Sequence, residues 1–236
     1  MRLTYIRWSM TIIETMGLTI ITDPVFRMLA LRQHPPSYPF ERMPQPDLVF
    51  LSHTHPDHFE PATLSRLPAG TPVWMPSPQL SRASGLSHLD LRGIRAWEEA
   101  TFRGVRLTAV PAVHGADELG LIVHGDRTAY FAGDTSLGKT LFAAIGRRWK
   151  LDAVLLPIGD LRTLGLSFGH IGPRQAPEAL RLLGEPHIVV PTHYSGMNIM
   201  PFMYCPGTPR KLSEALYREG VGSVVAVTRP LETIEF

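Results

Sequence analysis

Three imidazoles and a carboxylate lie within six residues of the stretch Ser52-His53-Thr54-His55-Pro56-Asp57-His58. Residues 47–51, directly before it, form an apolar block bounded by Pro46, which predicts a short buried strand. Residues 61–67 after it predict a helix, since Pro61 suits a first-turn position. Such side chains are costly to place on the turn that leaves a buried strand. The stretch therefore predicts a metal site at the end of a strand.

The spacing of this motif suits two adjacent metal ions. On an irregular turn, His53 and His55 can point to one side while Asp57 and His58 point to the other. Neutral imidazole and carboxylate suit zinc, iron or manganese. The alternative is a polar turn that merely happens to be rich in histidine. A lone His-x-His would be a weak signal, whereas His-x-His-x-Asp-His after an apolar strand is a specific one that requires more ligands downstream.

The motif resembles the metal-binding motif of the metallo-β-lactamase superfamily, which places two metals at the edge of an αβ/βα sandwich. The resemblance implies a later His, a bridging Asp and a last His, each at a strand end. The sequence offers His114, Asp134 and His193, and each of them follows an apolar run. By resemblance, the first ion is held by His53, His55 and His114, the second by Asp57, His58 and His193, and Asp134 bridges them. Seven ligands are too many for one tetrahedral metal and fit two metals that share a carboxylate.

Within the superfamily, the chain is more similar to the branch that contains N-acyl-phosphatidylethanolamine phospholipase D and L-ascorbate-6-phosphate lactonase. The matching stretches span nearly the whole chain and comprise residues 22–26, 131–135, 155–159, His170 with Pro173, Glu178 and Ala179, and residues 191–194. There are two departures. Arg7-Trp8 stands where the branch often has Gly-His, and residues 160–163 replace its usual aromatic and Pro-Arg residues. Both departures concern the substrate and leave the metal ligands intact.

Three residues outside the ligand set are candidates for other roles in the site. Asp23 is either a turn-forming residue before Pro24 or a carboxylate that orients a ligand imidazole, and the resemblance favours the second. His170 is either a loop histidine or a catalytic one that contacts substrate or protonates the leaving group, which the resemblance also favours. Tyr194 either donates to an oxyanion or packs as a buried tyrosine.

The ligand set predicts hydrolytic chemistry. Two metals about 3.5–4 Å apart lower the pKa of a bridging water toward about 7 and polarise the group under attack. Asp57 then orients the resulting hydroxide or accepts its proton, and no nucleophilic serine is needed. The sequence indeed contains no Gly-x-Ser-x-Gly elbow. The predicted cofactors are two divalent ions, with zinc as the default and manganese or iron as alternatives.

The predicted substrate is a small molecule with a phosphoester or phosphodiester bond, because both named relatives act on phosphate-bearing substrates. A lactone or another carboxylic ester is the close alternative. A nuclease is disfavoured because the chain has neither an added domain nor a basic cluster. A di-iron oxidative enzyme is disfavoured because such proteins tend to have a carboxylate where this chain has His55. A non-catalytic scaffold would lack ligands, and none is missing here.

The composition fits a globular enzyme and excludes several other classes. A chain of 236 residues with 44% apolar and 19% charged residues predicts a single domain, 1–236. The formal net charge of +2 does not favour nucleic acid as a partner. No run approaches the roughly 18 apolar residues of a membrane span, and a signal peptide is not evident. Cytoplasmic location is therefore expected, Cys205 is expected to be a free, inert thiol, and a homo-oligomer is possible.

The order of elements predicts an α+β protein with the four-layer αβ/βα sandwich of two mixed sheets. Strands are expected at 3–6, 11–13, 18–22, 47–51, 72–75, 94–97, 105–110, 120–124, 128–132, 153–157, 188–191 and 223–227. Helices are expected at 61–67, 137–145, 173–183 and 209–219, with a helical turn at 79–84. Residues 33–46 predict a stiff loop that includes His34, and residues 158–172 an irregular segment. The apolar stretch 197–204 predicts an adaptable pocket, a dimer contact or core.

Overall fold

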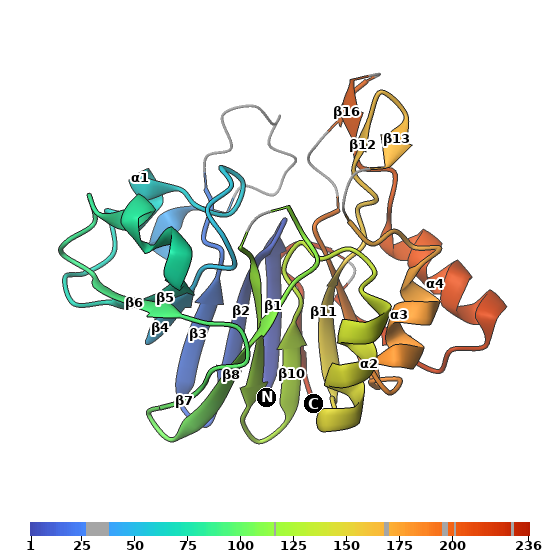
Figure 1. Ribbon diagram of the computed structural model, residues 1–236, viewed down its shortest axis with the longest axis horizontal. Helices are drawn as coiled ribbons and strands as arrows, with labels where there is room; N and C mark the ends of the chain where they lie inside the picture. Colours follow the sequence, from blue (N-terminus) through green and yellow to red (C-terminus); the bar gives the residue numbers. More distant parts are fainter. Residues whose placement is uncertain (27–37, 116, 168–169, 195–197, 201, 228) are drawn as a thin grey trace.

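Two mixed seven-stranded sheets form the centre of the molecule (Figure 1). The computed structural model describes residues 1–26, 38–115, 117–167, 170–194, 198–200, 202–227 and 229–236. Helices α2, α3 and α4 lie together on one side of the molecule and α1 lies on the other. This arrangement confirms the predicted metallo-β-lactamase-type sandwich of two mixed sheets flanked by helices. None of the helices in the described part of the chain has the length and apolar character that a bilayer crossing requires.

The first sheet begins with an antiparallel meander and continues with parallel strands. Met16 and Gly17 turn β2 into β3 with positive φ angles of 49° and 76°, as tight hairpins require. The parallel strands follow from β3 onward, so the carboxyl ends of β3, β4 and β5 meet at one edge. In spatial order the strands are β18 (Thr233–Glu235), β1 (Arg2–Arg7), β2 (Met10–Thr15), β3 (Leu18–Thr22), β4 (Leu48–Phe50), β5 (Pro72–Pro76) and β6 (Asp90–Ile94).

The second sheet mirrors this plan, with an antiparallel half followed by a parallel half. In spatial order its strands are β17 (Val224–Val225), β14 (Ile188–Thr192), β11 (Ala153–Pro157), β10 (Thr128–Phe131), β9 (Leu119–His124), β8 (Val105–Pro111) and β7 (Glu99–Phe102). A small third sheet stands above the sandwich and consists of β13 (Leu166–Ser167), β12 (Arg162–Thr163), β16 (Met203–Tyr204) and β15 (Asn198–Ile199).

The helices begin where the sequence offers a start signal. Pro61 stands at the first turn of α1, and Thr208 caps α4 by accepting a hydrogen bond from the Lys211 N–H. The α-helices are α1 (Pro61–Leu64), α2 (Lys139–Arg148), α3 (Ala176–Leu182) and α4 (Pro209–Glu219). Two 3₁₀ helices are η1 (Phe40–Arg42) and η2 (Ser77–Ala83).

Several sequence predictions need correction. The strand at 94–97 is wrong because β6 ends at Ile94 and a turn follows. In that turn the Glu98 carboxylate accepts the Arg95 N–H, and Trp97 has a φ of 67°. The helix at 61–67 is shorter than predicted, and the irregular segment 158–172 contains the β12–β13 hairpin. His34 lies outside the described residues.

The core lies between the two sheets and rests on aromatic contacts across them. Phe50 of β4 and Phe131 of β10 are fully buried, and their rings meet edge to face with centroids 6.3 Å apart. This geometry is favourable for aromatic pairs. Because Phe50 and Phe131 end strands that lead into metal-site loops, the same contact fixes the distance between those loops.

Replacing Phe131 with alanine is expected to lower the free energy of unfolding by about 3–5 kcal/mol, because it leaves a cavity in a fully buried position. Urea unfolding of the metal-free protein measures this. Phe202→Ala is the matched control, since its side chain is 61% exposed, and it should change stability by less than about 0.5 kcal/mol. Equal losses in both variants would contradict this account of the core.

Candidate metal centre

The predicted ligands lie on loops that leave four strands at one end of the sandwich. The histidine motif follows β4, His114 follows β8, Asp134 follows β10, and His193 follows β14 directly. A backbone hydrogen bond from the Leu119 N–H to the Ser52 carbonyl ties the first of these loops to the second sheet. Ligands far apart in the sequence are therefore brought to one place by the strand order.

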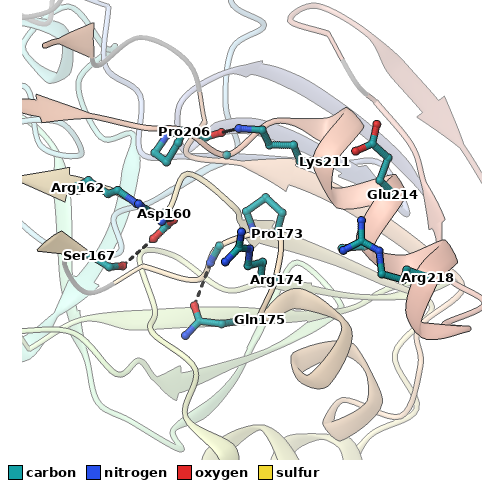
Figure 2. A pocket seen from close by; sticks show the side chains of 13 residues that line it. Asp160, Arg162, Ser167, Pro173, Arg174, Gln175, Pro206, Lys211, Glu214 and Arg218 are labelled. Carbon is teal, nitrogen blue, oxygen red and sulfur yellow. Dashed lines mark hydrogen bonds and ion pairs between the residues drawn. The ribbon is translucent and has the colours of Figure 1, made fainter. Parts of the chain in front are cut away.

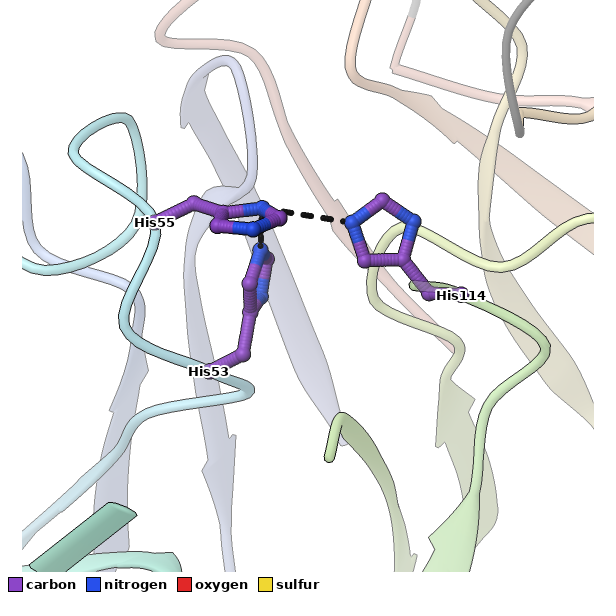
Figure 3. Close-up of side chains that lie close together, drawn as sticks. All are labelled: His53, His55 and His114. Carbon is purple, nitrogen blue, oxygen red and sulfur yellow. Dashed lines mark hydrogen bonds between the residues drawn. The ribbon is translucent and has the colours of Figure 1, made fainter. Parts of the chain in front are cut away.

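Three histidines form the first group (Figure 3). His53 Nε2 lies 2.8 Å from His55 Nδ1, and His114 Nε2 lies 3.2 Å from the same atom. His53 is fully buried, His114 is half-buried and His55 is exposed. Three imidazole nitrogens converging at the surface end of a buried site form a set that suits a divalent metal with room for an exogenous ligand.

Asp57, His58, Asp134 and His193 form the second group. Asp134 Oδ2 lies 3.0 Å from His58 Nε2 and 2.9 Å from His193 Nε2. Asp57 Oδ2 lies 3.6 Å and 3.5 Å from the same two nitrogens. Except for Asp57, whose side chain is 23% exposed, these side chains are almost completely buried.

Asp134 lies between the two groups. Together with His114 and His170 it forms a third cluster of possible ligands, and His170 Nε2 lies 3.2 Å from Asp134 Oδ2. The structure therefore brings His170 to the same carboxylate as two predicted ligands. Its predicted role as a proton donor is compatible with this position, and so is a role as a further ligand.

Asp23 orients one ligand imidazole. Its Oδ2 accepts a hydrogen bond from His58 Nδ1 at 2.7 Å, and its Oδ1 accepts the Ser52 N–H at 2.8 Å. Because Nδ1 of His58 is occupied in this way, Nε2 is directed toward Asp134. A carboxylate behind a histidine in this manner fixes the tautomer and the orientation of a metal ligand.

Two residues of the site were missed by the sequence analysis as candidates. Glu118 is buried, accepts the Asp134 N–H, and its Oε1 lies 3.6 Å from His53 Nδ1. Trp8 donates from Nε1 to Asp57 Oδ2 at 3.0 Å, and its ring lies 3.8 Å from that of His193. The only sequence signal for Trp8 was the Arg7-Trp8 departure from the related branch, and Glu118 had none.

Tyr194 and Cys205 lie close to this centre. The Tyr194 ring is buried and stacks on Tyr5, with centroids 5.4 Å apart. Its role as an oxyanion donor stays a prediction. Burial, with the Asp134 and Asp57 carboxylates nearby, raises the pKa of the Cys205 thiol to about 12. This thiol therefore stays protonated at neutral pH, as the expected inert cysteine would.

The two groups differ in their electrostatics in the metal-free chain. Burial and the neighbouring His58 lower the pKa of His53 to about 2, and burial lowers the pKa of His114 to about 4. Burial alone would lower the pKa of His58 as well, but Asp134, Asp57 and Asp23 outweigh it and hold that pKa well above its ordinary value. At neutral pH His53 and His114 are thus neutral, whereas His58 of the second group holds a proton.

The residues present fit a pair of divalent ions. The donors are imidazoles and carboxylates, the set that zinc, manganese and iron accept. Asp134 Oδ1 is buried without a hydrogen-bond partner among the described residues, and so is His193 Nδ1. Such an orphaned carboxylate oxygen is costly to bury, and a metal ion at this position would satisfy it.

These pKa values predict that the two groups release different numbers of protons when they bind metal. At pH 7 the second group should release about one proton or more per ion, because His58 must lose its proton first. The first group should release fewer, because His53 and His114 are already neutral. The affinity of the second group for metal should therefore rise with pH until the pH exceeds the pKa of His58. Titration calorimetry in two buffers of different ionisation enthalpy measures this, with His114→Ala and His193→Ala each leaving one group intact. Equal proton release in both variants would contradict the assignment.

Replacing Trp8 with phenylalanine is expected to weaken binding of one metal about 10–100-fold. The change removes the N–H that holds Asp57 and keeps an aromatic ring against His193. Competition with a colorimetric chelator measures the two metal affinities. The affinity for the ion at His53, His55 and His114 should stay unchanged. Trp149→Phe, remote from the ligands, is the control. A loss shared by both metal sites would indicate a general disturbance of the fold instead.

The comparisons with known proteins agree with this geometry. Residues 19–194 match the family described as beta-lactamase superfamily domain. The chain is 31% identical to a UPF0173 metal-dependent hydrolase of Opitutus terrae and 26% identical to that of Methanopyrus kandleri, with full coverage of each pair. Its fold is similar to the crystal structure of a possible metal-dependent hydrolase from Veillonella parvula, with a TM-score of 0.82 at 18% identity over 99% of this chain and 98% of the other.

These relatives establish the superfamily and the family, while the closer similarity to the phospholipase and lactonase branch stays a prediction. The His/Asp clusters of the chain could hold metal ions, as a metal-dependent hydrolase requires. The chain belongs to the metallo-β-lactamase superfamily and, within it, to the UPF0173 metal-dependent hydrolases.

Proposed function

We propose that this protein is a dinuclear metal-dependent hydrolase that cleaves a phosphoester or phosphodiester bond in a small molecule. The observation that carries the dinuclear assignment is the position of Asp134. Its carboxylate contacts His58 and His193 of one group, and one of its oxygens lies within 4.8 Å of a ring nitrogen of His114 of the other. A carboxylate shared in this way is the usual bridge between two closely spaced ions.

The first ion would be held by His53, His55 and His114, and the second by Asp57, His58 and His193. When bound, two such ions supply an activated water at neutral pH and polarise the bond under attack. The preference for zinc follows from the ligand types, with manganese and iron as alternatives.

The chain's own residues supply the proton transfers and the alignment. Asp57 carries the more exposed of the two carboxylates in the second group and would accept a proton from the attacking water. Trp8 holds Asp57 in position through its indole N–H. His170 lies beside Asp134 and would protonate the leaving oxygen.

A phosphoester ranks first because the chain resembles a branch whose members act on phosphate-bearing substrates. A lactone or another carboxylic ester is the alternative, since the same ligand set can polarise a carbonyl. A non-catalytic metal-binding scaffold is the third candidate and predicts bound metal without turnover.

The test is elemental analysis of the purified protein together with turnover of bis(p-nitrophenyl) phosphate and of δ-valerolactone. The chain is assayed as purified, after treatment with a chelator, and after addition of zinc, manganese or iron. About two metal equivalents per chain, with chelator-sensitive cleavage of the phosphodiester, would support the proposal.

The other outcomes choose between the alternatives. Preferential cleavage of the lactone would replace the phosphoester assignment with an ester hydrolase. About one equivalent after full reconstitution would refute the dinuclear site. Full metal loading without turnover of either class would favour the scaffold.

A further inference from the structure

One cavity of the molecule shares none of the candidate ligands of the metal centre. Its volume is about 530 Å³, within the range of sites for small molecules. One wall is the β12–β13 hairpin, the second is the loop that follows His170, and the third is α4 (Figure 2). Four cationic side chains line it: Arg162, Arg174, Lys211 and Arg218.

The two acidic side chains of this cavity are already engaged. Asp160 accepts from Arg162 at 2.8 Å and from the Ser167 hydroxyl at 2.6 Å. Glu214 accepts from Arg210, which does not line the cavity, at 2.8 Å. Asp160 therefore balances the charge of Arg162. Glu214 already balances Arg210, which lies outside the cavity.

Three cations remain without an acidic partner. Arg174 and Arg218 make no hydrogen bond or ion pair with any residue in the described part of the chain. The Lys211 ammonium donates to the Pro206 carbonyl at 2.7 Å, which leaves its charge uncompensated. Lys211 and Arg218 stand two turns apart on the same face of α4, opposite the loop that carries Arg174.

We propose that this cavity binds a small anion that carries a phosphate group. Like charges on its walls repel one another, and a bound anion would relieve that repulsion. Arginine presents a planar fork that matches phosphate oxygens in pairs, and lysine adds a compact charge. Arg174 lies on one wall and Lys211 and Arg218 on another, and the oxygens of a tetrahedral phosphate can accept from both walls at once.

The test measures the binding of inorganic phosphate to the purified protein by titration calorimetry at low ionic strength. The pocket variant is Arg174→Gln with Arg218→Gln. The charge-matched control is Arg82→Gln with Arg147→Gln, two exposed arginines elsewhere on the surface. A third variant, Asp134→Asn, disables the candidate metal centre and so separates binding there from binding in this cavity.

Phosphate is expected to bind the wild type, the control and the Asp134→Asn variant with similar affinity, and the pocket variant about tenfold or more weakly. That factor is the loss expected when two charge-assisted hydrogen bonds are removed. Binding should also weaken with added salt. Equal affinity in the pocket variant and its control, or binding abolished by Asp134→Asn alone, would overturn the proposal, as would the absence of binding to the wild type. None of these results depends on whether the metal centre hydrolyses a phosphoester.

Discussion

Replacing Asp134 with asparagine is expected to reduce hydrolysis by about 10³-fold or more and to lower the metal content by about one equivalent per chain. Losing the Lewis-acid contribution of one ion removes several kcal/mol of transition-state stabilisation, which sets this factor. The side chain keeps its size, but its charge, which faces His58, His170 and His193, is lost. Elemental analysis and kcat/KM on the best substrate of the panel measure the two effects.

The matched control is Asp90→Asn, because Asp90 is an exposed carboxylate on β6 far along the chain from every ligand. It should leave the metal content and kcat/KM unchanged. Retention of both metals by Asp134→Asn, with activity near that of the wild type, would show that Asp134 does not bridge the ions.

The second large effect is expected for His170→Asn. If His170 protonates the leaving group, kcat should fall about 10²–10³-fold while the metal content stays the same. The fall in kcat at high pH that reports loss of the acid's proton should disappear from the pH profile. The decrease in kcat should be smallest for substrates with good leaving groups. Comparing p-nitrophenyl and methyl phosphodiesters measures this selectivity.

The position of His170 also allows a different outcome. His114, Asp134 and His170 could together hold an ion, so a loss of metal in His170→Asn would identify His170 as a ligand and refute the acid role. His187→Asn, which alters an exposed histidine after α3, serves as the control and should change neither quantity.

The clustering of the predicted ligands could be foreseen because its signal is local. Each predicted ligand is a chemically distinctive residue within a few positions of the end of an apolar strand, and the strand order then brings these ends together. The sandwich was predicted for the same reason, since long alternating or apolar runs such as β8 and β14 read clearly as strands. Asp23 was within reach because it also follows a strand, although only the resemblance gave it a role.

What could not be predicted depends on contacts distant in sequence. Glu118 lies in a polar segment and becomes part of the site only because the chain folds back beside Asp134. Trp8 donates a hydrogen bond to Asp57, which lies 49 positions further along the chain. The alternating pattern at 94–97 predicted a strand, but the chain turns after Ile94. The Arg95 N–H donates to the Glu98 carboxylate, and this local hydrogen bond competes with strand pairing.

Because Trp8 contacts Asp57 and His193, its intrinsic fluorescence can report on the metal centre. The other tryptophans are engaged elsewhere: Trp97 stacks on Trp149, and Trp74 packs against Phe102. Only the indole of Trp8 touches the candidate ligands, so its emission responds to what those ligands hold. Paramagnetic manganese or iron beside the ring quenches that fluorescence, whereas the closed d shell of zinc does not. The emission of the protein therefore tells whether the native ion is paramagnetic, before any substrate is known.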